Sequence, residues 1–297
     1  TLFPYTTLFR SQGTPLGQTI LGPEENIKTI SRDDLVGYIQ QNYTANRMVL
    51  AGAGGVDHEE LVRLAEAAFS GLPKGPKIWL PTPAKYTGAE VRMTDEGMDH
   101  AHMAIAVQGA SWTSKDYFPL LVAQAIVGSW NRGLAGGANL ASKLAQVVAQ
   151  NGLAQSFLSF NTSYNDTGLF GIYMVSDHKS DLDDLVYEIQ QEWVRLCLGA
   201  TEAEVARAKT QLKASLLLSL DGTTPICEDI GRQILIYGKR FTWPEINQMI
   251  DTIDVKTVRR VASEYLYDRC PAVVALGPIG TFPDYNRIRA ATLWLRN

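Results

Sequence analysis

Apolar residues recur at helical spacing in several stretches, and most of these stretches open with a side chain that caps a helix. Asp57 with Glu60 and Thr201 with Glu204 are such openings: the first oxygen accepts an unpaired backbone N–H, and the acid three residues later reciprocates. The pattern predicts helices that begin after Ser31, Asp57, Thr201 and Thr242, and further helices over residues 115–129, 139–150, 181–198, 225–238, 254–267 and 284–295.

Short apolar or alternating runs, bounded by Gly, Asn or Asp, lie between the helices and predict strands. These runs cover residues 48–53, 101–108, 155–163, 168–175 and 272–276. Asn165 and Asp166 stand between the third and fourth runs, so we expect those two strands to form a hairpin. This order of elements predicts an α+β fold, with helices packed on a mainly antiparallel sheet.

One pattern occurs twice: a helix, a tyrosine, a short turn, an arginine, an apolar strand and a glycine. The first copy contains Tyr43 and Arg47, and the second contains Tyr265 and Arg269. Chance similarity is the alternative, because the repeated pattern is short. A duplication predicts a C-terminal remnant of a first unit over residues 12–72, a linker rich in Pro, Lys and Gly over 73–88, and a complete second unit over 89–297.

Residues 1–11, TLFPYTTLFRS, differ in character from the rest of the chain. They match neither a signal peptide nor a clear helix or strand, and they correspond to the in-frame translation of a common sequencing adapter. We therefore predict that they are an adapter-derived artefact and that the natural protein continues upstream of Gln12. A genuine disordered terminus is the alternative.

Composition narrows the class of protein further. The chain has 297 residues, 45% of them hydrophobic and 20% charged, with a net charge of −4, and these are ordinary values for a globular protein. No run of Lys or Arg forms the basic stripe of a nucleic-acid-binding protein. The three cysteines show no C-x-x-C spacing, which excludes a disulfide framework. No apolar run approaches the ~20 residues that span a bilayer.

Four stretches, residues 12–35, 42–55, 208–222 and 228–233, carry a resemblance to a known family. They are similar to stretches in the β subunits of mitochondrial processing peptidase and in core protein 1 of the cytochrome bc1 complex. Both groups belong to the pitrilysin-like metallopeptidases, the M16 family. The resemblance covers residues 12–297 and implies M16-like units, one of them complete and one present only as its C-terminal remnant.

The resemblance implies a mitochondrial protein with one of two roles. As a processing-peptidase β subunit, the parent protein is a zinc metalloendopeptidase that removes basic presequence peptides from imported proteins in the matrix, in a heterodimer with an α subunit. As core protein 1, it is a structural subunit of the bc1 complex, paired with core protein 2 on the matrix side of the inner membrane.

The family's zinc motif is His-x-x-Glu-His, followed by a more distant Glu ligand. None of the four histidines completes it: His58 has no partner at helical spacing, and His178 stands at a predicted helix start. His100 and His102 share one face of a predicted strand, but no third ligand is evident beside them. We therefore predict no catalytic residue and no metal ligand in this chain, and we expect zinc to be bound only by the full-length parent.

Three residues, Phe160, Tyr164 and Arg132, are candidates for substrate binding. Alternation along the strand predicts that Phe160, Thr162 and Tyr164 share one face, where the Tyr164 hydroxyl is placed to steady a scissile carbonyl. Arg132 is the third candidate. In the family, the second unit lines the cleft opposite the zinc-bearing unit, which motivates all three choices. Ordinary packing in a core or an interface is the alternative for each of them.

Overall fold

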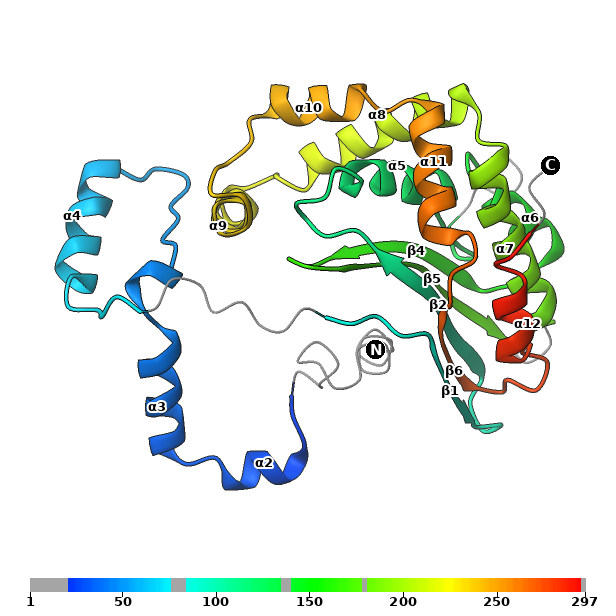
Figure 1. Ribbon diagram of the computed structural model, residues 1–297, viewed down its shortest axis with the longest axis horizontal. Coiled ribbons are helices and arrows are strands. Elements are labelled where there is room, and N and C mark those ends of the chain that lie inside the picture. The colour runs from blue at the N-terminus through cyan, green and yellow to red at the C-terminus, as the bar shows by residue number, and fades with distance from the viewer. Residues whose placement is uncertain (1–20, 76–83, 135–139, 178–180, 295–297) are drawn as a thin grey trace. The chain divides into compact units, whose positions relative to one another are not determined.

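The computed structural model describes residues 21–75, 84–134, 140–177 and 181–294 (Figure 1). Residues 1–11, half of the predicted linker and His178 lie outside this range. The chain forms two compact units: unit 1 contains residues 84–214 and 244–294, and unit 2 contains residues 21–75 and 215–243. We describe each unit by itself. The domain boundaries that the sequence suggests remain a prediction.

Unit 1 contains a six-stranded sheet in the order β1-β6-β2-β5-β4-β3. The strands are β1 (Ala89–Thr94), β2 (His100–Gly109), β3 (Ser129–Asn131), β4 (Ser156–Ser163), β5 (Gly168–Asp177) and β6 (Ala272–Gly277). β1 is parallel to β6, and the other four pairs are antiparallel. The α+β class and the mainly antiparallel sheet are therefore confirmed. The β4–β5 hairpin is also confirmed, with Ser163 opposite Gly168 at its closed end.

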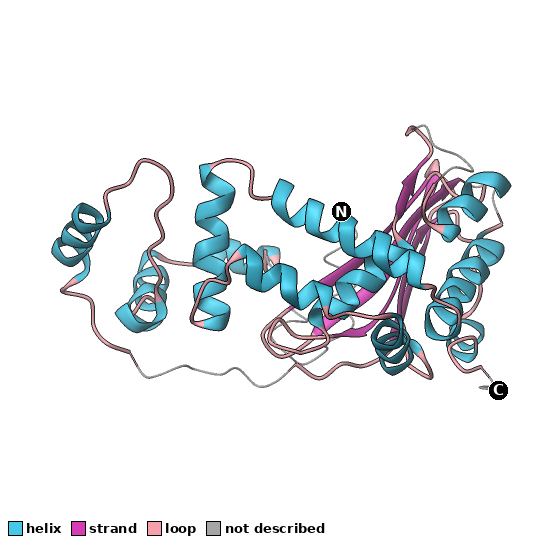
Figure 2. Ribbon diagram, turned by 90° about the horizontal axis from the view of Figure 1, so that it is seen from above, coloured by secondary structure: helices cyan, strands magenta, loops and turns pink. Residues whose placement is uncertain are grey.

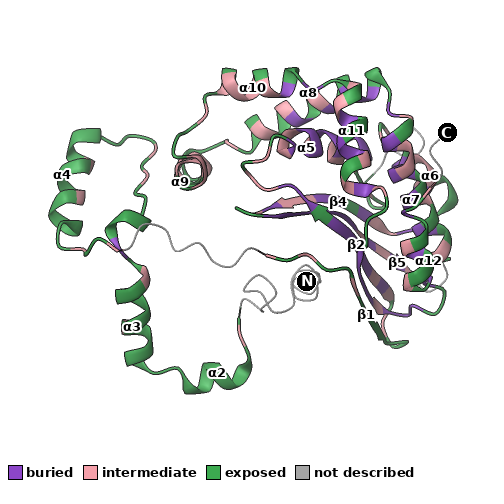
Figure 3. Cartoon of the chain, viewed as in Figure 1, coloured by how far each residue is buried: buried purple, intermediate pink, exposed green. Residues whose placement is uncertain are grey.

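The two faces of this sheet differ in burial. On one face, Met103, Ile105, Ile172 and Met174 are fully buried beneath helices. Side chains alternate between faces along a strand, so their neighbours point the other way. We call this second side the open face, because several of its side chains are partly exposed (Figure 3). It carries His102, Ala104 and Ala106 of β2, Leu158, Phe160 and Thr162 of β4, Leu169, Tyr173 and Val175 of β5, and Leu276 of β6.

The helices of unit 1 lie against the buried face of the sheet, which Figure 2 shows nearly edge-on. They are α5 (Tyr117–Val127), α6 (Lys143–Asn151), α7 (Leu182–Leu198), α8 (Glu202–Leu218, to Ala214 in this unit), α10 (Trp243–Asp251), α11 (Val255–Leu266) and α12 (Tyr285–Ala290). α11 packs against α7 and α5, and α5 also contacts β4. The capping pair at the start of α8 is confirmed: Glu204 N–H donates to Thr201 Oγ1, whose hydroxyl donates to the Glu204 carboxylate.

Unit 2 is built from helices without a buried apolar core. It contains α2 (Glu24–Thr29), α3 (Arg32–Asn42), the short 3-10 helix η2 (Ala45–Arg47), α4 (His58–Phe69), α9 (Thr223–Tyr237) and the end of α8. None of α2, α3, α4 and α9 has a buried residue, and Figure 3 colours α2, α3 and α4 almost entirely as exposed. Apolar side chains of α3, such as Leu35 and Ile39, are therefore open to solvent. The predicted caps at Ser31 and Asp57 are confirmed.

The structure differs from the sequence predictions in four elements. Residues 48–53 form no strand, because no strand of the described chain pairs with them and an isolated extended segment lacks stabilising hydrogen bonds. β1 was missed because Glu90 and Arg92 interrupt its apolar pattern, and β3 was missed because it has only three residues. α12 ends at Ala290, earlier than predicted.

No helix among the described residues is both long and apolar enough to cross a membrane.

Candidate functional site

Phe160 anchors the apolar part of the open face. Its ring is 7% exposed and forms a cluster with Ala106 and Leu169, against which the partly buried Tyr173 packs. Gly171 lies between Phe160 and Ala106 in the register, and its missing side chain leaves room for the Phe160 ring. Phe160 therefore serves the packing of this face and contributes its remaining exposed edge to the surface.

Tyr164 follows Phe160 by four residues at one end of β4, whereas Arg132 lies at the other end of this strand. Tyr164 is half-buried and lies one residue beyond β4, where its N–H donates to Thr167 O in the hairpin. Arg132 is exposed, and its N–H donates to Gln155 O, just before β4 begins. Because extended chain rises ~3.3 Å per residue, the backbones of Arg132 and Tyr164 lie about 30 Å apart. A single ligand group cannot contact both side chains.

A polar contact on the open face joins His102 to Tyr173. His102 Nδ1 lies 2.7 Å from the Tyr173 hydroxyl, and the two rings are stacked with their centroids 6.3 Å apart. Ala104 stands directly opposite Tyr173 in the register, one position along from His102 on the same face of β2. The spacing of His100 and His102 on one strand face is compatible with a cross-strand role for them, but it did not indicate Tyr173 as the partner.

Burial affects the protonation of both rings. Burial, followed by the nearby His100, lowers the pKa of His102, so the imidazole is neutral at physiological pH. Burial raises the pKa of Tyr173, so the phenol keeps its proton. The pair is therefore an uncharged hydrogen-bonding unit that stands among apolar side chains.

The described residues do not fit the zinc centre that the family implies. Within the described ranges, no three His, Cys, Asp or Glu side chains gather as a metal site would require. His102 Nδ1 contacts the Tyr173 hydroxyl, and a tyrosine hydroxyl is not among the usual zinc ligands, which are Cys, His, Asp and Glu. We therefore derive no step through zinc from the residues of this chain.

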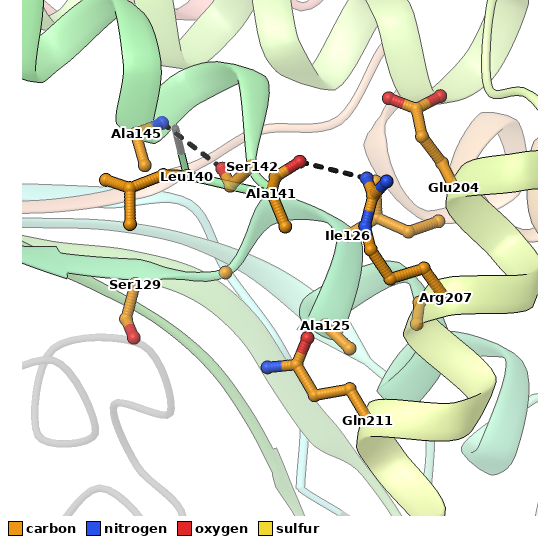
Figure 4. A pocket seen from close by; sticks show the side chains of 12 residues that line it. Ala125, Ile126, Ser129, Leu140, Ala141, Ser142, Ala145, Glu204, Arg207 and Gln211 are labelled. Atoms are coloured by element: carbon orange, nitrogen blue, oxygen red, sulfur yellow. Dashed lines mark hydrogen bonds between the residues drawn. The ribbon is translucent and has the colours of Figure 1, made fainter. Parts of the chain in front are cut away.

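A small polar pocket lies on the helix-covered side of unit 1 (Figure 4). It has a volume of about 170 Å³ and lies between the end of α5, the start of α6 and α8. Arg207 Nη2 donates to Ala141 O at 2.9 Å, and Ser142 Oγ caps α6 by accepting from Ala145 N. Glu204, a third lining residue, is held by Arg195 and Thr201. These bonds fix the ends of α6 and α8, and the pocket is too small for an extended peptide.

Comparison with known proteins relates the chain to peptidases. A family model described as "Peptidase M16 inactive domain" matches residues 29–212. The chain is 56% identical over 282 residues to the mitochondrial-processing peptidase subunit beta of Blastocladiella emersonii, an alignment that covers 95% of the chain and 60% of that protein. It is 50% identical over 299 residues to the subunit beta of Homo sapiens, covering 100% of the chain and 61% of that protein.

The chain thus spans about three fifths of the length of the curated relatives it matches. A solved structure, "Complex III2 from Candida albicans, Inz-5 bound", contains a chain that superposes with a TM-score of 0.94 at 30% identity. That superposition covers 99% of this chain and 70% of the other. Since the family model spans more than half of the sequence and the fold agrees, this chain belongs to the M16 peptidase family.

Proposed function

We propose that this chain is part of a β-type mitochondrial processing peptidase, a zinc metalloendopeptidase that removes basic presequences from imported proteins. The identity of 50% and 56% to two such β subunits, along nearly the whole chain, is the observation that carries the proposal. Zinc and the residue that activates water belong to the His-x-x-Glu-His motif, which is not part of the printed sequence. The proposed location is the mitochondrial matrix.

Within that enzyme, we assign peptide binding to the open face. A substrate peptide presents apolar side chains and a row of backbone N–H and C=O groups. The open face offers an apolar contact at the exposed Leu158, the small exposed edge of the buried Phe160 beside it, and a polar group at the Tyr164 end of β4. The chain thus binds and orients the peptide and, through the Tyr164 hydroxyl, stabilises the scissile carbonyl as the peptide bond breaks, while the zinc motif belongs to another part of the parent protein. An α subunit is the proposed partner.

The test uses the full-length protein, purified together with its α subunit, and a synthetic arginine-rich presequence. We expect cleavage that is lost on treatment with a chelator and restored by zinc. Tyr164→Phe should lower kcat about tenfold with little change in KM, if its hydroxyl bonds the carbonyl only as the peptide bond breaks. Lys256→Ala, on an exposed part of α11, is the matched control and should leave both constants unchanged.

A second candidate is core protein 1 of the bc1 complex, because the solved chain that superposes so closely belongs to a complex III structure. Its partner would be core protein 2, and its role would be structural. The same preparation separates the two candidates. A protein that assembles into a membrane complex with core protein 2 but shows no zinc-dependent cleavage would support this candidate and contradict the first.

A further inference from the structure

The His102–Tyr173 pair has a hydrogen-bonding group left over. One ring nitrogen, Nδ1, contacts the Tyr173 hydroxyl at 2.7 Å. We assign the phenol as the donor, which places the single hydrogen of the neutral imidazole on Nε2. No partner among the described residues is recorded for this Nε2–H. The ring is only partly buried, so the donor is accessible to a ligand.

The surroundings of this donor suit an extended chain. Val175 stands directly opposite His102 on β5, and Leu276 stands opposite it on β6. Leu158 stands opposite Tyr173 on β4 and is 45% exposed. A fixed neutral donor among apolar side chains discriminates in favour of a backbone carbonyl, because a charged group would lose its hydration without a counter-charge.

We propose that His102 binds a backbone carbonyl of the substrate peptide through Nε2–H, and that Tyr173 is a positioning residue that fixes the orientation of the His102 ring. This inference rests on the proposed function and names a binding contact within it. The contact forms with the ground-state peptide and is kept as the peptide bond breaks. It therefore contributes to KM and not to kcat.

The test measures binding separately from cleavage. A fluorescein-labelled arginine-rich presequence is titrated against the full-length heterodimer in the presence of a chelator, and KM and kcat are measured separately with zinc. His102→Leu should weaken binding about fivefold and raise KM equally, with kcat unchanged. His102→Gln, which keeps an N–H donor, should recover part of the loss. Tyr173→Phe should weaken peptide binding by an intermediate amount. The His102 ring remains in this variant, but the orientation and the tautomer of that ring are no longer fixed by the Tyr173 hydroxyl.

A set of peptides with single ester bonds tests the backbone contact itself, since an ester carbonyl is a weaker acceptor than an amide carbonyl. When the ester replaces the amide whose carbonyl contacts His102, it should weaken peptide binding to the wild type more than it weakens peptide binding to His102→Leu. His58→Gln, which changes an exposed histidine on α4, is the matched control and should bind like the wild type. Equal binding by wild type and His102→Leu, in a heterodimer that cleaves normally, would overturn the inference while leaving the proposed function intact. A wild-type heterodimer that never cleaves would instead contradict the proposed function.

Discussion

Replacing Arg195 with methionine should lower the free energy of unfolding by about 4 kcal/mol, because it leaves the buried Glu192 without its ion-pair partner and leaves Glu204 with only Lys143, whose Nζ lies 3.6 Å away. The Arg195 guanidinium donates to both oxygens of Glu192 at 2.7 Å and to Glu204 at 3.0 Å. The side chains of Glu192 and Glu204 are only 4% and 7% exposed. Urea denaturation of the chain, followed by tryptophan fluorescence, measures this loss in the free energy of unfolding.

The control is Arg287→Met, which breaks a pair with Asp183 in the same unit. The Arg287 side chain is 61% exposed, so the change should cost less than about 1 kcal/mol. A loss at Arg195→Met no larger than the loss at Arg287→Met would show that the buried network does not stabilise the fold.

The stability deficit of Arg195→Met should depend on pH. Burial raises the pKa of Glu192 even in the wild type, where the contacts with Arg195 oppose the effect. Without Arg195, the folded protein holds a carboxylate whose pKa lies above its unfolded value, so folding takes up a proton and stability falls as pH rises. The deficit should therefore be smaller at about pH 5 than at about pH 8.

Replacing Gly171 with alanine should cost about 3 kcal/mol of stability by overpacking the centre of the sheet. A Cβ atom at this position would lie 2.5 Å from Ile105 O, 2.7 Å from Phe160 Cζ and 2.8 Å from Ala106 Cβ. The first of these atoms belongs to the backbone of β2 and cannot move without disturbing the hydrogen bonds between the strands. The same urea titration measures the cost.

Gly280→Ala is the control for this substitution, since nothing lies within 4 Å of the Cβ it would add. Its stability should equal or slightly exceed that of the wild type, because alanine restricts the unfolded chain. If Gly171→Ala were as stable as Gly280→Ala, the register that places Phe160 and Ala106 on either side of Gly171 would be wrong.

Patterns of residues close in sequence predicted several elements of unit 1. The capping pair of Thr201 and Glu204 and the turn at Asn165 depend on residues close in sequence, so the sequence alone showed the start of α8 and the β4–β5 hairpin. The strand expected over residues 48–53 failed because a strand depends on a neighbour, and the pattern within a segment does not say whether one is present.

The candidate site was less accessible from the sequence. Alternation correctly placed Phe160 and Thr162 on one face, but the separation of Arg132 from Tyr164 depends on the β3–β4 register. The His102–Tyr173 contact joins residues 71 positions apart, and it forms because β2 and β5 pair in a register that places Ala104 opposite Tyr173. Only the pairing of strands distant in sequence reveals such a contact.

The most direct test of the central claim, that this chain binds peptide without carrying the catalytic metal, measures zinc and turnover on the same sample. The purified 297-residue chain is dialysed against zinc, analysed for metal content and assayed with the labelled presequence. We expect no stoichiometric zinc and no cleavage by this chain, whereas the full-length heterodimer should bind zinc and cleave. One zinc ion per chain together with real turnover would show instead that this chain carries a catalytic metal of its own.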